Sequence, residues 1–512
     1  MPIPVIDLFA GPGGLGEGFS SLVDGKGKPV FKIKLSIEKD EYAHHTLELR
    51  AFFRQFPRNE IPSAFYDYLA GLITRVQLFE GYPKQASCAA EEAWLAELGA
   101  STAPNNLVNE RIIKSLNGES HWVLIGGPPC QAYSLVGRSR IRGESEEKYQ
   151  DDHRHFLYRE YLRILAVHQP PIFIMENVKG LLSAEVKHQR IFPRILSDLI
   201  NPRTAIKGME PVRGTKAFSY RLISLVKTQT NLFGDFEPED FIVRAEKYGI
   251  PQARHRVIIL GVRADVSIDP HLLSDVPPVS IEDVIGDLPR LRSGLSKEQD
   301  SAKAWQDAVQ QIAKAEWLRN GEISKDVCDA IKHTIERVSS RLKRGDEFLS
   351  LVVTPKVYSD WFIDPKLGGI CNHTTRGHIR ADLHRYFFAT LFARIKGHSP
   401  QLEDFPKSLL PKHENVKEAL KGSKFNDRFR VQVRGRPSTT VVSHISKDGH
   451  YFIHYDPTQC RSLTVREAAR LQTFPDNYFF EGPRTEQYRQ VGNAVPPLLA
   501  QQIAKIVAAI VP

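Results

Sequence analysis

The feature that most constrains this chain is an apolar run that stops at two glycines and two prolines. Residues 123–125 read Val-Leu-Ile, and residues 126–131 read Gly-Gly-Pro-Pro-Cys-Gln. The run predicts a buried strand, which must end here because proline cannot donate to a sheet ladder. Cys130 is therefore expected at the carboxyl end of a strand, where open α/β sheets bind ligands. A lone cysteine there is more often an inert core residue, so its role depends on its neighbours.

Composition bounds the class of protein. Of the 512 residues, 41% are hydrophobic and 25% are charged, which is typical of a globular protein with two or more domains. The net charge of +9 favours a polyanionic partner, although many basic proteins bind no nucleic acid. The five cysteines form no CxxC pair, which suits a reducing cytoplasm. Because no leader and no apolar run of ~18 residues is present, we expect a cytoplasmic protein with no membrane partner.

The first 40 residues follow the order strand, glycine loop, helix, strand. Apolar residues at 4–9 precede the glycine-rich stretch 10–19, and a second strand at 31–37 ends in Glu38. Glycines let the backbone approach a ligand, and an acid at this point is placed to bind ribose hydroxyls. A tight turn with an exposed glutamate explains this pattern alone equally well. Residues 51–120 are read as an insertion that is helical near 65–71 and 89–98.

Downstream of the cysteine, polar residues again follow apolar runs. The buried strand predicted at 171–175 ends in Glu176, and a partly buried glutamate can donate a proton near neutrality. Arg254 and Arg256 alternate at the start of another strand and are expected to point to one face. Two guanidiniums there would bind a carbonyl or phosphate, or stabilise a thiolate. A helix-capping glutamate and a pair of surface arginines are the alternatives.

These motifs, in their order along the chain, resemble the DNA cytosine-5 methyltransferase family. The matching stretches span residues 5–500 and read DLFAGPGG, IEKD, GGPPCQAYS, MENVKG, PQARHRV, RSLTVREAARL and QVGNAVPP. The resemblance implies an α/β fold with a Rossmann-like, S-adenosylmethionine-dependent methyltransferase sheet that carries helices on both faces. It also implies a smaller target-recognition domain.

The resemblance further implies a covalent mechanism on a cytosine that is flipped out of duplex DNA. Cys130 is expected to attack C6 of the base, because C5 is a poor nucleophile until that adduct forms. Glu176 is expected to engage N3 and the exocyclic amine. Arg254 and Arg256 are expected to hold the O2 atom and the active-site loop. The methyl group would come from S-adenosyl-L-methionine.

The family pattern also implies binding residues. Those expected for the cofactor are Asp7, Phe9, Gly11, Gly13, Gly14, Glu38, Pro129, Leu157, Asn493 and Val495. The acid that meets the adenine amine is not placed, and Asp67 is the nearest candidate. Those expected for DNA are Ser134, Arg138, Gln252, Arg428, Arg430 and Thr440. Arg428 and Arg430 belong to a basic run suited to phosphate contacts, with a solvated face as the alternative. Cys371, His373 and His378 lack a fourth ligand, so no metal is expected.

The expected domains are a catalytic domain at 1–270 with an insertion around 51–120, a target-recognition domain at 271–455, and C-terminal motifs and a helix at 456–512 that return to the catalytic domain. Thr464 and Glu467 predict a capping box at the start of a helix. We expect a prokaryotic, nucleoid-associated monomer that binds double-stranded DNA and protects it within a restriction–modification system. A cognate restriction endonuclease acting on the same site would be a second partner.

Three alternatives compete with this interpretation. A methyltransferase for RNA cytosine would share the motifs, but the long interval 270–460 favours DNA. A DNA-binding protein with an inactive catalytic fold is disfavoured by the intact Cys130, Glu176, Arg254 and Arg256. A nicotinamide-dependent dehydrogenase would need GxGxxG before a helix and gives GGPPCQ no role.

Overall fold

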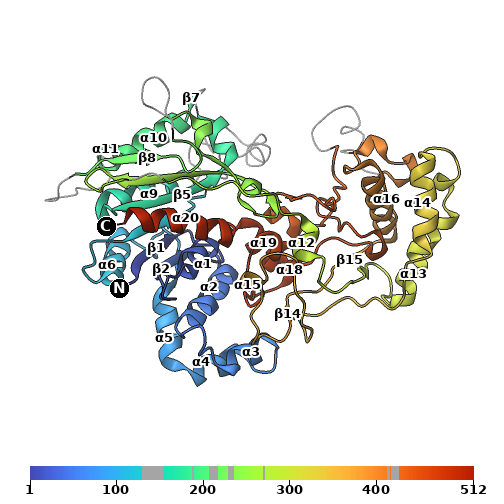
Figure 1. Ribbon diagram of the computed structural model, residues 1–512, viewed down its shortest axis with the longest axis horizontal. Coiled ribbons are helices and arrows are strands. Elements are labelled where there is room, and N and C mark those ends of the chain that lie inside the picture. The colour runs from blue at the N-terminus through green and yellow to red at the C-terminus, as the bar shows by residue number, and fades with distance from the viewer. Residues whose placement is uncertain are drawn as a thin grey trace.

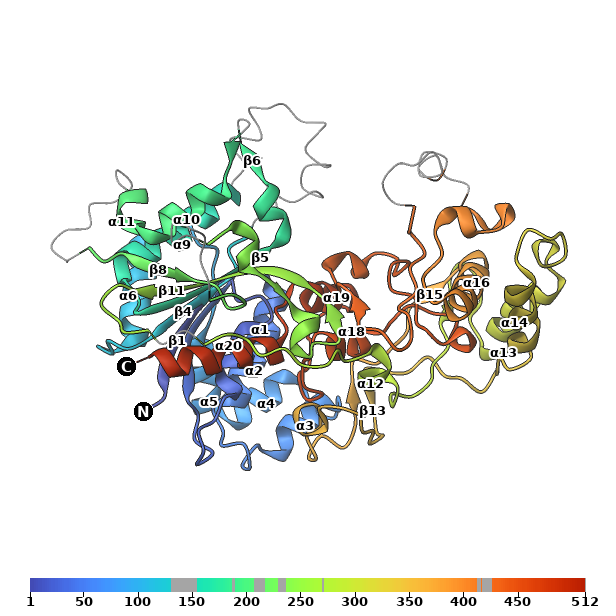
Figure 2. The same cartoon turned by 45° about the horizontal axis from the view of Figure 1, so that its top comes forward.

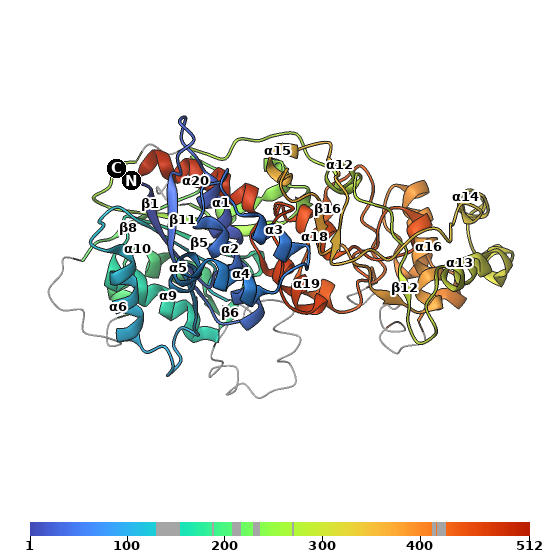
Figure 3. The ribbon, with the colours of Figure 1, turned by 90° about the horizontal axis from the view of Figure 1, so that it is seen from below.

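The structure is a computed structural model that describes residues 1–129, 154–186, 189–206, 217–228, 236–268, 271–411, 416 and 426–511. Figure 1 shows a sheet with its covering helices at one end and helices α13 (Ala302–Gln310), α14 (Lys325–Ile335) and α16 (Arg380–Lys396) at the other. Both chain termini lie at the sheet end (Figures 1 and 3). Within the described part of the chain, no helix combines the length and apolarity of a bilayer span.

The central sheet is mixed. Its strands are β1 (Ile3–Leu8), β2 (Phe31–Glu38), β3 (Ala93–Leu95), β4 (Val123–Gly126), β5 (Ile172–Val178), β8 (Tyr220–Ile223), β9 (Ile242–Arg244) and β11 (His255–Arg263). The order is β3-β2-β1-β4-β5-β11-β8, with β9 paired to β11. The first five strands are parallel, whereas β11 is antiparallel to β5, β8 and β9. Strands covered on both faces need near-continuous apolar runs, which is why β4 and β5 were visible in the sequence.

Helices cover both faces of the sheet. On one face, α1 (Gly14–Ser21) and α20 (Pro497–Ile510) share a hydrophobic cluster with β1, β4 and β5. On the other face lie α6 (Asn105–Leu116), α9 (Arg154–His168) and α10 (Phe192–Ile200). A Cβ at Gly18 would come within 2.3 Å of the Ala500 Cβ, so α20 packs closely on α1 because that position is glycine. The predicted α/β class with helices on both faces is confirmed.

One secondary-structure prediction in the insertion was wrong. The helix expected near 65–71 is α3 (Ser63–Leu69), which packs with α2 (Glu41–Arg54), α4 (Arg75–Gly81) and α5 (Pro83–Glu92). The helix expected across 89–98 ends instead at Glu92, and the next three residues form the edge strand β3. A three-residue strand is too short for sequence periodicity to reveal, and pairing with β2 decides it.

The smaller part of the molecule has a separate hydrophobic cluster around α13, α14 and α16. Its strands are only two residues long and pair in isolated couples.

The other α-helices and short strands of the described chain are α11 (Pro202–Ala205), α12 (Ile281–Ile285), α15 (Ser359–Phe362), α18 (Val465–Leu471), α19 (Arg484–Asn493), β6 (Glu185–Val186), β7 (Gln189–Arg190), β10 (Gln252–Ala253), β12 (Gly294–Leu295), β13 (Phe348–Leu349), β14 (Ile370–Cys371), β15 (Gly377–His378) and β16 (Ser438–Thr439). A third cluster, which includes residues of α12, α18 and α19, lies between the two parts.

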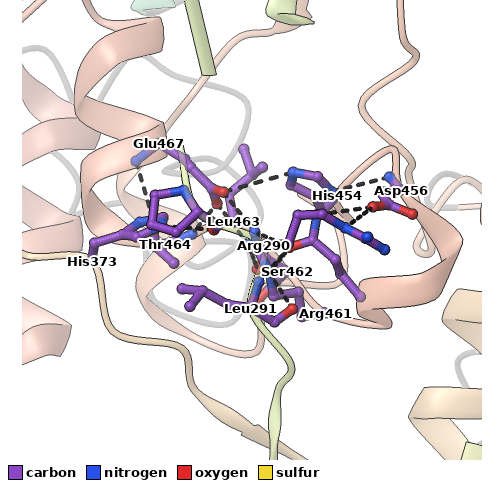
Figure 4. Close-up of polar contacts among 12 residues, drawn as sticks. Arg290, Leu291, His373, His454, Asp456, Arg461, Ser462, Leu463, Thr464 and Glu467 are labelled. Atoms are coloured by element: carbon purple, nitrogen blue, oxygen red, sulfur yellow. Dashed lines mark hydrogen bonds and ion pairs between the residues drawn. The ribbon is translucent and has the colours of Figure 1, made fainter. Parts of the chain in front are cut away.

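A buried polar network joins the chain near residue 291 to the chain near residue 461 (Figure 4). Arg461 pairs with Glu467 at 2.6 Å, and both side chains are 1% exposed. The Arg461 Nε also donates to the Leu291 carbonyl oxygen at 3.3 Å. Thr464 and Glu467 form the predicted capping box at the start of α18, which confirms that prediction. The network therefore joins the outgoing segment near residue 291 to the returning segment near residue 461.

Candidate active site

The order of the sheet reverses at β1, which lies between β2 and β4. In open α/β sheets, ligands bind at such a switch point beyond the carboxyl ends of the strands. Leu8 and Gly126 are paired at that end of β1 and β4. A Cβ at Gly126 would lie 2.7 Å from the Leu8 carbonyl oxygen, so glycine lets the two strands end close together. The candidate site consists of the segments that leave this edge of the sheet.

The glycine loop after β1 has an unusual backbone. Phe9, Gly11 and Gly13 have φ angles of 57°, 57° and 93°. Glycine adopts such angles freely, whereas at Phe9 the surrounding structure must impose them. A Cβ at Gly14 would lie 2.2 Å from the Val495 carbonyl oxygen. This contact brings together two predicted cofactor residues from opposite ends of the chain.

Glu38 closes the same loop from the end of β2. Its carboxylate accepts hydrogen bonds from the backbone N–H groups of Gly11 at 2.7 Å, Lys39 at 2.9 Å and Asp40 at 2.7 Å. Burial raises the pKa of Glu38, although the three N–H groups oppose that shift. The carboxylate thus lies beside the glycine loop, and its ribose-binding role stays a prediction.

Asp7 is a predicted cofactor residue whose buried carboxyl has no hydrogen-bond partner among the described residues. It is 0% exposed, and neither carboxyl oxygen makes a hydrogen bond with a described residue. Burial raises the pKa of Asp7 to about 8, against the opposing effects of the Arg54 charge and the Gly16 backbone. A buried polar group without a partner is costly. A ligand with a polar group at this edge would relieve that cost.

Glu97 is the first acidic residue after strand β3. The Ala96 N–H donates to the Glu38 carbonyl oxygen at 2.9 Å, so the chain leaves β3 beside the end of β2. Glu97 follows directly, and its carboxylate pairs with Lys39 at 2.9 Å. Asp67 instead lies on α3, a helix that Figure 1 shows apart from the sheet. The position after the third strand therefore belongs to Glu97, which was hidden because β3 was read as helix.

Glu176 and Arg256 meet at the edge formed by β5 and β11. The Arg256 Nε lies 3.0 Å from Glu176 Oε1. Burial lowers the pKa of Arg256, and the Glu176 charge opposes this shift. A Cβ at Gly127 would lie 3.0 Å from Glu176 Oε2, so the carboxylate lies against the segment that leads to Cys130.

Asn177 is a positioning residue that the sequence reading did not single out. Its Nδ2 donates to the Pro128 carbonyl oxygen at 3.0 Å, and its Oδ1 accepts from the Val178 N–H at 2.9 Å. The amide therefore fixes the two-proline segment beside Glu176. Cys130 itself lies outside the described residues, as do Ser134 and Arg138.

Arg254 differs from Arg256 in what it contacts. Its guanidinium donates to the carbonyl oxygens of Val441 at 2.7 Å and Ala494 at 2.8 Å. Burial first, and then the Arg256 charge, lower the pKa of Arg254 well below its usual value. The two arginines therefore do not share one set of partners, and Arg254 links the sheet to the segments near residues 441 and 494.

Gln252 and Thr440 belong to the same internal link. Gln252 is 0% exposed, and its amide contacts the Val441 N–H at 2.7 Å and Gln472 Oε1 at 3.0 Å. The Thr440 hydroxyl donates to the Ala253 carbonyl oxygen at 2.5 Å. Because its hydrogen bonds are satisfied internally, Gln252 is not available for the DNA contact that was expected, and its role here is structural.

The remaining predicted cofactor residues lie on α9, after β4 and at the end of α19. Leu157 is buried on α9, one turn before Tyr161, whose ring lies 3.2 Å from a Cβ placed at Gly126. Pro129 ends the described segment after β4, and Asn493 is the last residue of α19. Segments from both ends of the chain thus converge on one edge of the sheet.

The predicted DNA-contacting arginines of the smaller part carry acidic partners. Arg428 Nη2 lies 3.3 Å from Asp448 Oδ2, and Arg430 pairs with Asp427. Phe429 between them is 1% exposed and belongs to the hydrophobic cluster. The phenylalanine is therefore a core residue, while both arginines remain partly exposed. No cluster of three or more metal-ligating side chains occurs among the described residues.

Comparison with known proteins identifies the family to which these features belong. The description "C-5 cytosine-specific DNA methylase" applies to the family whose profile matches residues 100–202 and 209–508. The chain belongs to this family. It is therefore a DNA (cytosine-5-)-methyltransferase, and its fold class agrees with that assignment.

Named relatives of this methyltransferase are of the type II kind. The chain is 31% identical to the type II methyltransferase M.Bpa9945I of Bacillus paralicheniformis, and the match covers 98% of each chain. It is 27% identical to M.DdeI of Desulfomicrobium norvegicum over 75% of this chain and 71% of that one. It is 28% identical to the DNA (cytosine-5-)-methyltransferase M.ApeKI of Aeropyrum pernix over 77% of this chain and 82% of that one. The methyltransferase is accordingly of the type II restriction–modification kind.

Proposed function

We propose that this methyltransferase modifies C5 of a cytosine that is flipped out of a specific duplex sequence, through a covalent bond between Cys130 and C6. The observation that carries the proposal is the Glu176–Arg256 pair at 3.0 Å. That pair lies against Gly127, three residues before Cys130. An acid and a cation are thereby held beside the segment that delivers the thiol.

The proposed steps balance charge within the base. The Cys130 thiolate adds to C6, and the electron pair released into the ring makes C5 nucleophilic while Glu176 donates a proton toward N3. S-adenosyl-L-methionine, when bound, supplies the sulfonium methyl group that C5 accepts. Water accepts the C5 proton as the 5,6 double bond re-forms and the Cys130 thiolate is expelled, and N3 returns its proton to Glu176. The co-product is S-adenosyl-L-homocysteine, a neutral thioether. A base inside the duplex cannot reach such a pocket, which is why flipping is part of the proposal.

The two arginines receive different roles in this proposal. Arg256 contacts Glu176 and is the group that would bind the base at O2. Arg254 is a positioning residue, because its guanidinium is held by the carbonyl oxygens of Val441 and Ala494. It would act by keeping the segments around residues 441 and 494 against the strand that carries Arg256.

The residues at the switch point fit S-adenosylmethionine. Glu38 lies beside the glycine loop and would accept from the ribose hydroxyls. Asp7 offers a buried carboxyl without a hydrogen-bond partner among described residues, and Glu97 follows β3 and would accept from the adenine amine. Close packing of Gly14 on Val495 shapes the same edge. The proposed cofactor residues are Asp7, Phe9, Gly11, Gly13, Gly14, Glu38, Glu97, Pro129, Leu157, Asn493 and Val495.

We further propose a division into a catalytic domain at 1–270, a target-recognition domain at 271–455 and returning C-terminal motifs at 456–512. In this arrangement Ser134, Arg138, Arg428, Arg430 and Thr440 are the proposed DNA contacts. The enzyme would act as a monomer and protect DNA at a site that a cognate endonuclease cleaves.

Bisulfite sequencing of DNA from cells that express the chain tests this function. We expect protected cytosines within one short sequence, and none in cells that express Cys130→Ala. A trapped covalent complex with duplex DNA that carries 5-fluorocytosine in that sequence should form with the unaltered chain only. Absence of protected cytosines, or methylation by Cys130→Ala at the unaltered rate, would refute the proposal.

A further inference from the structure

We propose that a polar pocket between the smaller part and helix α19 binds a phosphate of the DNA backbone. The cavity has a volume of about 290 Å3, and its lining includes Arg376, His378, Lys447, Arg484 and Thr485. This inference rests on the proposed DNA substrate and extends it to a contact outside the catalytic edge. None of these residues takes part in the chemistry proposed above.

Positive charge is concentrated at this pocket. The Arg344 Nη2 and the Arg484 Nη1 both donate to the Thr375 carbonyl oxygen, at 3.0 Å and 2.9 Å, which holds two guanidiniums close together. Arg376, the next residue, packs its guanidinium 4.3 Å from the centre of the Tyr488 ring. Burial, and the charges of Arg376 and Arg344, lower the pKa of Arg484. Arg344 already pairs with Asp300 at 3.3 Å. An anion in the pocket would therefore compensate the charges of Arg376 and Arg484, which line it.

The acids that line the pocket have partners of their own. Asp382 accepts from Arg385 at 2.7 Å, and Asp448 accepts from Arg428 at 3.3 Å. Burial lowers the pKa values of His378 and His450, so both rings are neutral at pH 7. Among the described residues, Lys447 has no carboxylate partner, and it is exposed. Its ammonium group is therefore available to a ligand.

Helix α19 adds backbone donors to the pocket. The helix has ten residues and begins at Arg484, after Pro483, which provides no side-chain cap. Within the described ranges, no group accepts a hydrogen bond from the backbone N–H of Arg484 or Thr485. Free N–H groups and the positive end of the helix dipole favour a phosphate at this position.

The position of α19 relates the pocket to the catalytic edge. Figure 2 shows α19 between the sheet and the part that carries β15 and α16. Its first residues line the pocket, while its last residue leads to Val495, which packs on the glycine loop. A ten-residue helix is about 15 Å long. A duplex bound at the catalytic edge is wide enough to place one of its phosphates in a pocket about 15 Å away.

The salt dependence of duplex binding tests the pocket. Lys447→Gln removes the exposed ammonium and should reduce the slope of log Kobs against log[salt] by about 1, with equal loss for specific and random duplexes. Arg484→Gln should reduce the slope similarly. Lys32→Gln is the matched control, because Lys32 is exposed near the opposite end of β2 and should leave the slope unchanged.

Two outcomes would overturn the inference. One is that Lys447→Gln and Arg484→Gln both keep the unaltered slope, and the other is that Lys32→Gln lowers it equally.

Duplexes with a single methylphosphonate provide an independent readout: one position should weaken binding by the unaltered chain but not by Lys447→Gln. Bisulfite sequencing separates the two proposals, since protected cytosines with unchanged slopes would refute the pocket alone. No protected cytosines would refute the enzymatic proposal.

Discussion

The switch point of the sheet and the junction between the two parts bury carboxylates in opposite ways. Asp7 at the switch point is fully buried and makes no hydrogen bond with any described residue. Glu467 at the junction is 1% exposed but accepts two hydrogen bonds from Arg461 and one from the Thr464 N–H. The Asp7 carboxyl thus has no hydrogen-bond partner among the described residues, whereas the Glu467 carboxylate has three.

This difference distinguishes a ligand site from a structural link. A fully satisfied buried network rigidifies the segments that it joins, and at the junction those are the segments near residues 291 and 461. A buried carboxyl without partners lowers stability unless a ligand completes it. We therefore read the switch point as a binding edge and the junction as the element that fixes its geometry.

The largest expected effect is a loss of methyl transfer at the sheet edge without a loss of stability. Cys130→Ala should reduce methyl transfer by more than roughly 10⁴-fold, because no other group can form the C6 bond. Cofactor binding and the melting temperature should stay unchanged. Cys88→Ala, which alters a half-buried cysteine on α5, is the control and should retain activity. Equal activity losses in both variants would remove the basis for the assignment.

The next largest effect is a loss of stability when the buried network at the junction is broken. Glu467→Ala leaves the Arg461 guanidinium buried without its carboxylate, and should lower the free energy of unfolding by about 3–5 kcal/mol. Replacing both partners, by Arg461→Met with Glu467→Leu, should recover most of that loss. Chemical denaturation measures both. If the single variant is as stable as the unaltered chain, the junction is not the structural link described above.

The pH dependence of stability should differ between the two regions. The raised pKa of Asp7, about 8, means that the folded state holds a proton that the unfolded state releases above its ordinary pKa of 3.8. Its contribution to stability therefore falls as pH rises from about 4 to about 8. Asp7→Asn should abolish that decline and stabilise the protein at pH 8 by a few kcal/mol. Denaturation of both forms at pH 6 and pH 8 would show it, and parallel pH profiles would contradict it.

The junction should respond to acid in the opposite direction. Arg461 holds the pKa of Glu467 far below its ordinary value, and burial lowers the pKa values of His373 and His454 to about 4. In each case the unfolded state binds protons first as pH falls, so stability is lost from about pH 6.5 downward for the two histidines and from about pH 4.5 downward for Glu467. His373→Gln should flatten part of this loss in a denaturation series between pH 4 and pH 7. An unchanged profile would exclude that histidine as a contributor.

A smaller effect distinguishes Arg254 from Arg256: one substitution should mainly lower stability, and the other should mainly lower activity. Arg254→Ala should lower the free energy of unfolding by about 1–3 kcal/mol, because two carbonyl oxygens lose a charged donor. Arg256→Ala should lower activity more than stability, because its partner is Glu176. Thermal melting and steady-state rates on the same preparations compare them. The reverse ranking would exchange the two proposed roles.

The smallest effect concerns the adenine side of the cofactor site. Glu97→Gln should weaken S-adenosylmethionine binding by about threefold to tenfold, the equivalent of one hydrogen bond. Asp67→Asn is the matched control, because that acid lies on α3, which Figure 1 shows apart from the sheet. Calorimetric titration with the cofactor measures both. A larger loss for the Asp67 variant would return the role to that residue.

Local patterns predicted the elements whose signal is contained in a few neighbouring residues. The buried strands that end near Leu8, Gly126 and Glu176 were visible as apolar runs, and the Thr464–Glu467 box as a cap. Strand β3 was not visible, because three residues at a sheet edge carry no periodicity and only pairing with β2 defines them. Glu97 was missed for the same reason.

The sequence by itself determined the family, the α/β sheet and the residues that follow each strand, because apolar runs and turn residues act locally. Only the tertiary structure decided which polar groups those residues would meet. Arg254 contacts a carbonyl 187 positions away, and Gln252 contacts a side chain 220 positions away. Such partners depend on how distant segments pack, so alternation along one strand could not show that Arg254 and Arg256 would bind different groups. The same packing leaves Asp7 without a partner and gives Glu467 three donors.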